Sequence, residues 1–200
     1  MVDDPGHLGT TRSFETTQGH MTYPELSERL AVALARILDR ILATSVQDIV
    51  ITPDWLCERH RDLAGDLFPD WAGRFRTTDV KVGTLEPPPF YQVPMLVRSF
   101  CDDLAERLRH LPEDDLTRTA ALLAWVDWRF QWIHPFKDFN GRIGRMALAA
   151  LLYKLALPPV ETAPTDPDGR RAYLEGLRAA DAGDLLPLQH QWIARLAAAI

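Results

Sequence analysis

The feature that most restricts the fold of this chain is a helical repeat of apolar residues that recurs in one segment after another. In the first such segment, leucine and isoleucine recur every three or four positions, at Leu26, Leu30, Leu34, Ile37, Leu38 and Ile41. This stripe is typical of an amphipathic helix that buries one face. Because helical patterns follow one another without alternating with strands, a parallel sheet is not expected and an all-α fold class is predicted.

Start and stop signals place the predicted helices. Residues 23–25 (Tyr-Pro-Glu) and 52–54 (Thr-Pro-Asp) are typical helix starts, since proline is tolerated in a first turn. The second of these helices is expected to stop near Gly65, and further helices are predicted over 95–110, 116–133, 142–155, 170–182 and 187–200. Residues 1–20 show little periodicity and are predicted to form an extended or partly ordered arm. Residues 21–200 are then one domain.

One segment, residues 74–93, has a different pattern. Residues 74–82 alternate and are rich in arginine and threonine, which favours a short strand, and residues 90–93 can return as a second strand. Gly83 and the prolines at 87–89 separate the two. We therefore expect a small β-hairpin flap, and because a lone hairpin is only marginally stable, it must lean on the helices or on a partner.

Charge and composition exclude several classes of protein. The 28 acidic and 22 basic residues give a net charge of −6, which argues against a nucleic-acid partner. No apolar run is long enough to span a bilayer, and the N-terminus lacks a signal-peptide pattern, so no membrane partner is expected. Cys57 and Cys101 fit no metal spacing and are interpreted as reduced thiols. These observations predict a cytoplasmic single-domain protein.

Residues 133–145 (IHPFKDFNGRIGR) hold an unusual concentration of chemically active side chains. His134 comes at the end of a predicted helix, because Pro135 prevents the helix from continuing, and an imidazole there can act as a general base. Asp138 supplies a carboxylate suited to Mg²⁺.

The same segment also contains the elements of an anion-binding site. Asn140-Gly141 forms a turn that leads into the next helix, whose first N–H groups and dipole favour a negative ligand. Arg142 and Arg145 lie on one side of that first turn and raise the positive potential further. Base, metal ligand and phosphate-binding groups within twelve residues are the groups required for transfer of a phosphate-containing group.

This segment resembles the signature of the Fic family, HPFx(D/E)GNGRxxR. The matching positions are His134, Pro135, Phe136, Asp138, Asn140, Gly141, Arg142 and Arg145. The resemblance implies a mostly helical domain with a β-hairpin flap ahead of the motif, as the hairpin at 74–93 would provide. It also implies an enzyme that transfers AMP from ATP to a Ser, Thr or Tyr hydroxyl of a target protein and releases pyrophosphate.

The roles that the resemblance implies can be assigned residue by residue. His134 would be the catalytic base and Asp138 would hold Mg²⁺ on the ATP phosphates. The residues that would bind the nucleotide are Phe139, Asn140, Gly141, Arg142, Gly144 and Arg145. The target protein would dock on the flap by strand addition. Small members of the family are often toxins silenced by a separate antitoxin, and some act after delivery into a host cell.

One position departs from the signature, because Phe139 stands where the family has glycine. If the loop needs a positive φ there, phenylalanine is strained. We expect a negative φ instead, so that the Phe139 N–H still serves the anion site and its ring covers the nucleotide or packs beneath the loop.

Many Fic proteins carry an inhibitory helix with the pattern [S/T]xxxE[G/N]. Residues 11–16, 14–19 and 171–176 each fit this pattern only in part. For the first two, a loose arm is the simpler interpretation.

Two alternatives to AMP transfer stay open at this stage. The same fold can use another donor, such as UTP, GTP or a diphosphate-linked choline, or it can remove AMP. The phosphate-binding motif does not distinguish these possibilities, because it does not contact the nucleobase of the donor. Alternatively, Phe139 marks a catalytically weak module that binds a nucleotide or a partner protein, although the intact His134 argues against this.

Overall fold

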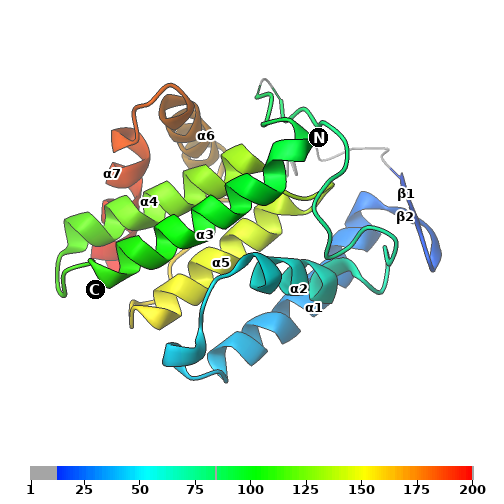
Figure 1. Cartoon of the computed structure of the whole chain (residues 1–200), viewed down its shortest axis with the longest axis horizontal. Coiled ribbons are helices and arrows are strands. Elements are labelled where there is room, and N and C mark those ends of the chain that lie inside the picture. The colour runs from blue at the N-terminus through cyan, green and yellow to red at the C-terminus, as the bar shows by residue number, and fades with distance from the viewer. Residues whose placement is uncertain (1–12, 84, 200) are drawn as a thin grey trace.

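The computed structural model describes residues 13–83 and 85–199, and the all-α class is confirmed over this part of the chain (Figure 1). One two-stranded antiparallel sheet, β1 (Ser13–Thr16) and β2 (Gly19–Thr22), precedes the helices. The helices are α1 (Tyr23–Leu42), α2 (Pro53–Ala64), α3 (Val93–Arg109), α4 (Leu116–Ile133), α5 (Asn140–Lys154), α6 (Pro167–Asp181) and α7 (Leu186–Ala199). Short 3-10 turns lie at Val46–Asp48 and Phe90–Gln92.

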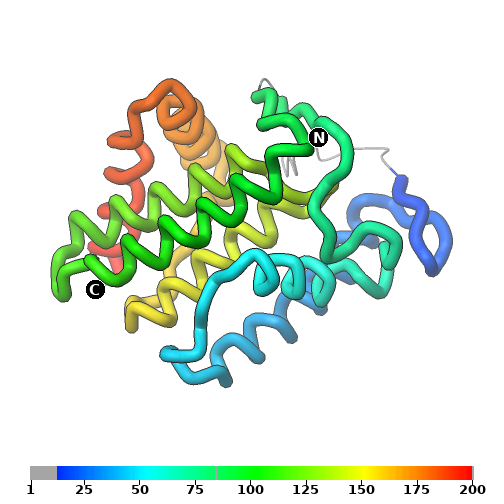
Figure 2. The backbone as a smooth tube through the Cα atoms, in the orientation of Figure 1, coloured from blue at the N-terminus to red at the C-terminus, as the bar shows by residue number. Residues whose placement is uncertain are grey.

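Helices α4 and α5 form the centre of the molecule. Helix α4 packs against α3, α5, α6 and α7, while α5 packs against α1 and α2 as well. Figures 1 and 2 show α3, α4 and α5 as neighbouring diagonal helices, with α1 and α2 on one side and α6 and α7 at the other end. Both central helices are buried around much of their circumference. The loop that joins them, residues 134–139, is therefore fixed at both ends in the core.

The helix boundaries follow the capping chemistry of the sequence. Thr22 donates from its backbone N–H and its hydroxyl to the Glu25 carboxylate, at 2.7 Å each, at the start of α1. The Thr52 hydroxyl accepts from the Trp55 N–H at 3.0 Å at the start of α2. The predicted starts at residues 23, 53 and 116 are confirmed. The other four helices begin one to three residues earlier than predicted, within the usual uncertainty of a helix end.

The predicted strands at 74–93 are wrong. Residues 74–83 and 85–89 belong to a loop in which Val82 and Leu85 make one bridged pair, and residues 90–92 form a 3-10 turn that leads into α3. The alternating pattern gave a wrong strand prediction for a physical reason. The buried Arg76 side chain bonds to backbone carbonyls of the loop and of α4 instead of lying on the face of a sheet. From here on, the name flap is used for residues 76–89 only.

The hairpin of this structure lies instead in the segment predicted to be an arm. Phe14 pairs with Met21 and Glu15 with His20, across a turn in which Gly19 adopts a φ of +96°. The Thr16 hydroxyl steadies the turn by donating to the Gly19 carbonyl at 2.7 Å. Residues 1–12 lie outside the described part of the chain.

This hairpin also shows that the described residues of the two N-terminal candidates do not form an inhibitory helix. Residues 13–16 and 19–22 form strands and residues 17–18 a turn, so Glu15 and Gln18 are not on a helix, and the remaining residues of the first candidate, 11 and 12, lie outside the described part. The third candidate lies within α6, where the Glu175 side chain is exposed to solvent.

Across residues 13–83 and 85–199, no helix combines the length and the apolar composition that crossing a membrane requires. Cys101 is buried and Cys57 is half-buried, and both are free thiols.

Candidate active site

The loop between α4 and α5 is closed by hydrogen bonds of its own. The Asn140 side chain accepts from the Phe136 N–H and donates to the Phe136 carbonyl, at 2.9 Å each. Phe136 is fully buried, as the sequence predicts for a loop anchor. His134 ends α4 in the left-handed region, with a φ of 49°. The loop therefore presents its polar groups in a fixed arrangement.

The His134 ring is held by a hydrogen bond to the backbone of α4. Its Nδ1 lies 3.3 Å from the Gln131 carbonyl oxygen, and because a carbonyl can only accept, Nδ1 carries the hydrogen. The lone pair is then on Nε2. Burial lowers the pKa of His134 to about 4, since the charged imidazolium is poorly solvated there. The ring is thus neutral and able to accept a proton at pH 7.

Asp138 lies in the same loop as His134, four residues further along the chain, and is largely buried. Its Oδ1 accepts from the Phe139 N–H at 2.8 Å. The described residues hold no group of three or more His, Cys, Asp or Glu side chains that could bind a metal by themselves. Mg²⁺ is usually held by one or two carboxylates together with substrate phosphates, so a single Asp138 fits an ion that arrives with a nucleotide.

The predicted negative φ of Phe139 is wrong. Phe139 adopts a φ of 61°, in the left-handed region that favours glycine. Its N–H bonds to Asp138, so in this structure that group does not serve an anion. Of the two placements expected for its ring, the structure shows the one beneath the loop, because the side chain is 1% exposed and lies against Phe68, Trp71 and His60.

The two arginines of the motif flank the first turn of α5. Arg142 donates from Nη2 to the Ser27 hydroxyl on α1, at 2.9 Å, and its guanidinium lies 5.6 Å from the centre of the Phe139 ring. Arg145 lies over Gly141, where an added Cβ would come within 3.2 Å of Arg145 Nη1. The first N–H groups of a helix have no acceptor within the helix, so helix end and arginines together form a positive site.

Gly144 was predicted to bind the nucleotide, but its position indicates a different role. The residue is buried against α4, and a Cβ at Gly144 would meet Gln131 Nε2 at 2.7 Å and Phe130 Cδ1 at 3.1 Å. Glycine at this position therefore permits the close approach of α4 and α5.

Comparison with known proteins agrees with this geometry. Residues 50–152 match the family model described as the Fic/DOC family. The chain belongs to the Fic/DOC family.

Named relatives extend the likeness of this Fic chain beyond the motif. It is 31% identical over 183 residues to a Drosophila persimilis protein named protein adenylyltransferase Fic, covering 90% of this chain and 34% of that protein. A Nematostella vectensis protein of the same name is 32% identical over 137 residues, covering 68% of this chain and 30% of that protein. The Fic chain thus spans about a third of the length of the curated relatives it matches.

Solved structures show the same fold. Fic-1 from C. elegans superposes with a TM-score of 0.63 at 28% identity, covering 89% of this Fic chain and 52% of the other. The BepC protein from Bartonella tribocorum, solved with bound AMPPNP, superposes with a TM-score of 0.71 at 19% identity, covering 94% of each chain.

His60 supports the Fic motif from beneath, a role that sequence reasoning did not find. It is fully buried on α2, its Nδ1 accepts from the Gly73 N–H at 2.8 Å, and its Nε2 donates to the Asp138 carbonyl at 3.2 Å. The ring stacks on Phe136 with centroids 4.0 Å apart. Burial lowers the pKa of His60 to about 4. The only signal in the sequence was its place on the apolar face of the second predicted helix.

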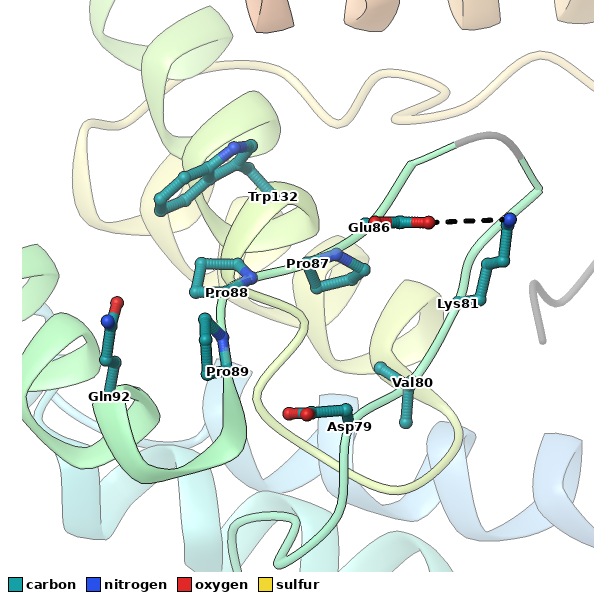
Figure 3. A pocket seen from close by; sticks show the side chains of 9 residues that line it. All are labelled: Asp79, Val80, Lys81, Glu86, Pro87, Pro88, Pro89, Gln92 and Trp132. Atoms are coloured by element: carbon teal, nitrogen blue, oxygen red, sulfur yellow. Dashed lines mark ion pairs between the residues drawn. The ribbon is translucent and has the colours of Figure 1, made fainter.

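A groove opens between the flap and the end of α4, where Trp132 lines it (Figure 3). It has a volume of about 690 Å³ and lies between the two arms of the flap and Trp132. Figure 3 shows the Trp132 ring above Pro87 and Pro88, with Lys81 and Glu86 paired across the flap at 3.5 Å. The flap thus forms a wall of a groove although it is not a hairpin of two strands.

Proposed function

We propose that this chain transfers AMP from ATP to a hydroxyl group of a target protein. The observation that carries the proposal is the arrangement around residues 134–145. A neutral imidazole stands one loop away from a helix N-terminus that carries two arginines and a neighbouring carboxylate. The relatives named protein adenylyltransferase Fic support the same reaction.

In this reaction the target hydroxyl oxygen bonds to the α-phosphorus of ATP while the bond to the β-phosphate oxygen breaks. His134 Nε2 accepts the hydroxyl proton, and pyrophosphate leaves with the electron pair of the broken bond. Arg142, Arg145 and the first N–H groups of α5 would hold the leaving phosphates by charge and hydrogen bonds. Asp138 would bind Mg²⁺, which neutralises phosphate charge when bound.

The reacting groups must also be held at a fixed separation, and the fold provides for this. The loop is closed by Asn140 and supported by His60, so the base and the anion site are kept rigid relative to each other. Catalysis of this kind relies mainly on positioning and on charge stabilisation. We further propose that the target docks in the groove between the flap and Trp132, which lies two residues before His134 in the chain.

Labelling with α-labelled nucleotides tests the proposal. The full chain is incubated with Mg²⁺, a cell lysate and labelled ATP, and we expect labelled protein from the wild type and at least about a hundredfold less from His134→Ala. His110→Ala is the matched control, because His110 is an exposed histidine at the end of α3 that pairs with Glu106. Equal labelling by His134→Ala and the wild type would contradict the proposal.

The same assay distinguishes the alternatives. Label from UTP or GTP but not from ATP would assign a different donor to the same site. No label from any nucleotide, with no transfer from a diphosphate-linked choline and no removal of AMP from labelled protein, would indicate a binding module, and the Phe139 N–H that is engaged by Asp138 would then be the first contact to examine. A separate antitoxin-like inhibitor stays a prediction from the resemblance, to be tested by whether purified chain is active alone.

A further inference from the structure

Arg76 is buried in the flap and bonds to several backbone segments at once. The residue is 4% exposed. Its Nε donates to the His134 carbonyl at 2.9 Å, Nη1 donates to the Thr78 carbonyl at 3.1 Å, and Nη2 donates to the carbonyls of Pro88 and, at 3.4 Å, Ile133. One guanidinium therefore joins the catalytic histidine, the end of α4 and both arms of the flap.

The α4 side of this cluster has a clear physical reason. The last carbonyl groups of a helix receive no hydrogen bond from an N–H group of the same helix, and burying them without another donor costs free energy. Ile133 and His134 are such residues, and Arg76 supplies their donors from a planar group with five N–H bonds. The Arg76 backbone N–H also donates to the Pro135 carbonyl at 2.9 Å.

The flap side of the cluster replaces the missing strand pairing. Thr78 lies on the outgoing arm and Pro88 on the returning arm, and Arg76 bonds to both. Asp79 adds a link near the surface, because its Oδ1 accepts from the Phe90 N–H at 2.8 Å and lies 3.7 Å from Arg76 Nη1. Figure 3 shows Asp79 and Pro88 on the two arms that face each other across the groove.

We propose that Arg76 is a positioning residue that fixes the flap groove relative to His134, so that a hydroxyl held in the groove meets the base. This inference rests on the proposed function, because it assigns the flap a part in presenting the acceptor. The bond of the His134 ring to the Gln131 carbonyl does not involve Arg76. Loss of the guanidinium is therefore expected to release the flap more than the base.

The substitution Arg76→Lys tests this because lysine keeps the charge but cannot reach both arms and α4 from one nitrogen atom. Two transfers are compared: AMP to the purified protein that the lysate experiment labels, and AMP to water with no target present. We expect the ratio of the first to the second to fall at least about tenfold, with the affinity for Mg-ATP within about twofold of the wild type. An unchanged ratio, or a parallel loss of Mg-ATP affinity, would overturn the proposal.

Two further variants control for general damage to the fold. Arg59→Lys changes a half-buried guanidinium that pairs with Glu58 and Asp62 of its own helix, and we expect it to leave the ratio unchanged. Asp79→Ala removes the exposed link between the arms without altering the buried carbonyls, and we expect a smaller fall in the same ratio. A fall with Arg59→Lys as large as that with Arg76→Lys would assign the effect to stability alone.

Hydrogen exchange gives a readout that does not depend on the reaction. In Arg76→Lys we expect faster amide exchange over residues 77–86, with residues 140–150 of α5 unchanged. If wild-type chain transfers no AMP, the proposed function fails while the exchange result still tests the link between flap and α4. Equal exchange over residues 77–86 in both proteins would overturn the role of Arg76 directly.

Discussion

Phe139 combines an unfavourable backbone with a favourable side chain. A non-glycine residue in the left-handed region costs about 1 kcal/mol, whereas a fully buried aromatic ring contributes roughly 3 kcal/mol or more. The ring packs on Phe68 and Trp71 and lies beneath Arg142. Burial therefore outweighs the strain, which explains how phenylalanine occupies a position where the family signature has glycine.

Comparison of two substitutions at this position separates the two contributions. Phe139→Ala and Phe139→Gly both remove the ring, so both should lower the free energy of unfolding, by about 2–4 kcal/mol. Only glycine relieves the positive φ, so Phe139→Gly should be the more stable of the two by about 1 kcal/mol. Chemical denaturation of both variants measures the difference. An alanine variant as stable as the glycine variant would show that the backbone there is not strained.

His134 sets an expectation for the pH dependence of the reaction. Because burial lowers its pKa to about 4, the base form should already dominate at about pH 5, and kcat/KM should not rise further with pH through 6.5. Asp127→Asn is the control, since burial raises the pKa of Asp127 to about 6. A rise in kcat/KM centred near pH 6.5 that persists in Asp127→Asn would contradict the buried, neutral state of His134.

At the scale of elements, the sequence predicts helices well and the flap poorly. Helix positions follow from the 3.6-residue repeat and from capping residues such as Thr52, which act within a few residues. The flap has an alternating sequence, but besides the local Val82–Leu85 pair it bonds to Pro135 and, through the Arg76 side chain, to the end of α4. The bonds to Pro135 and to α4 are long-range contacts, which no local pattern contains. The hairpin at 13–22 was missed because its strands are only four residues long.

The packing of α4 against α5 makes a specific prediction for two glycines. Gly144→Ala would place a Cβ 3.1 Å from the Phe130 ring and 2.7 Å from Gln131 Nε2, so we expect a loss of about 1–3 kcal/mol in unfolding free energy. Gly141→Ala, on the same helix, meets only the movable end of Arg145 at 3.2 Å. Gly141→Ala should change the free energy of unfolding by no more than about 1 kcal/mol, because alanine has a better helix propensity than glycine. Thermal unfolding of both variants tests this order, and equal losses would refute it.

At the scale of the whole molecule, the part of the site that is contiguous in sequence was predictable and the supporting part was not. Residues 134–145 carry the base, the carboxylate and both arginines within one segment. The residues that hold this segment in place, His60 and Arg76, lie more than fifty positions earlier in the chain. Only the packing of α2 and the flap against the motif brings them to it. Their chemistry as buried hydrogen-bonding groups becomes apparent only once burial is known.

Three buried groups set the dependence of stability on pH. His60 and His134 have pKa values of about 4 in the folded chain against an ordinary 6.5, so unfolding takes up two protons between these values. Asp127, which accepts from the Tyr173 hydroxyl at 2.7 Å, has its pKa raised by burial from 3.8 to about 6, so unfolding releases one proton in nearly the same window. The net uptake of one proton means that stability falls as the pH drops from 6.5 toward 4, by about 1.4 kcal/mol per pH unit.

Two substitutions change this slope in opposite directions. His60→Gln keeps an acceptor for the Gly73 N–H and a donor for the Asp138 carbonyl but cannot take up a proton, so the slope should nearly vanish. Asp127→Asn still accepts from Tyr173 but no longer opposes the histidines, so the slope should roughly double. Urea denaturation at several pH values measures all three slopes, and because the exposed carboxylates are common to the three proteins, their background cancels in the comparison. Parallel slopes in the wild type and both variants would show that these buried groups do not govern the acid sensitivity of the fold.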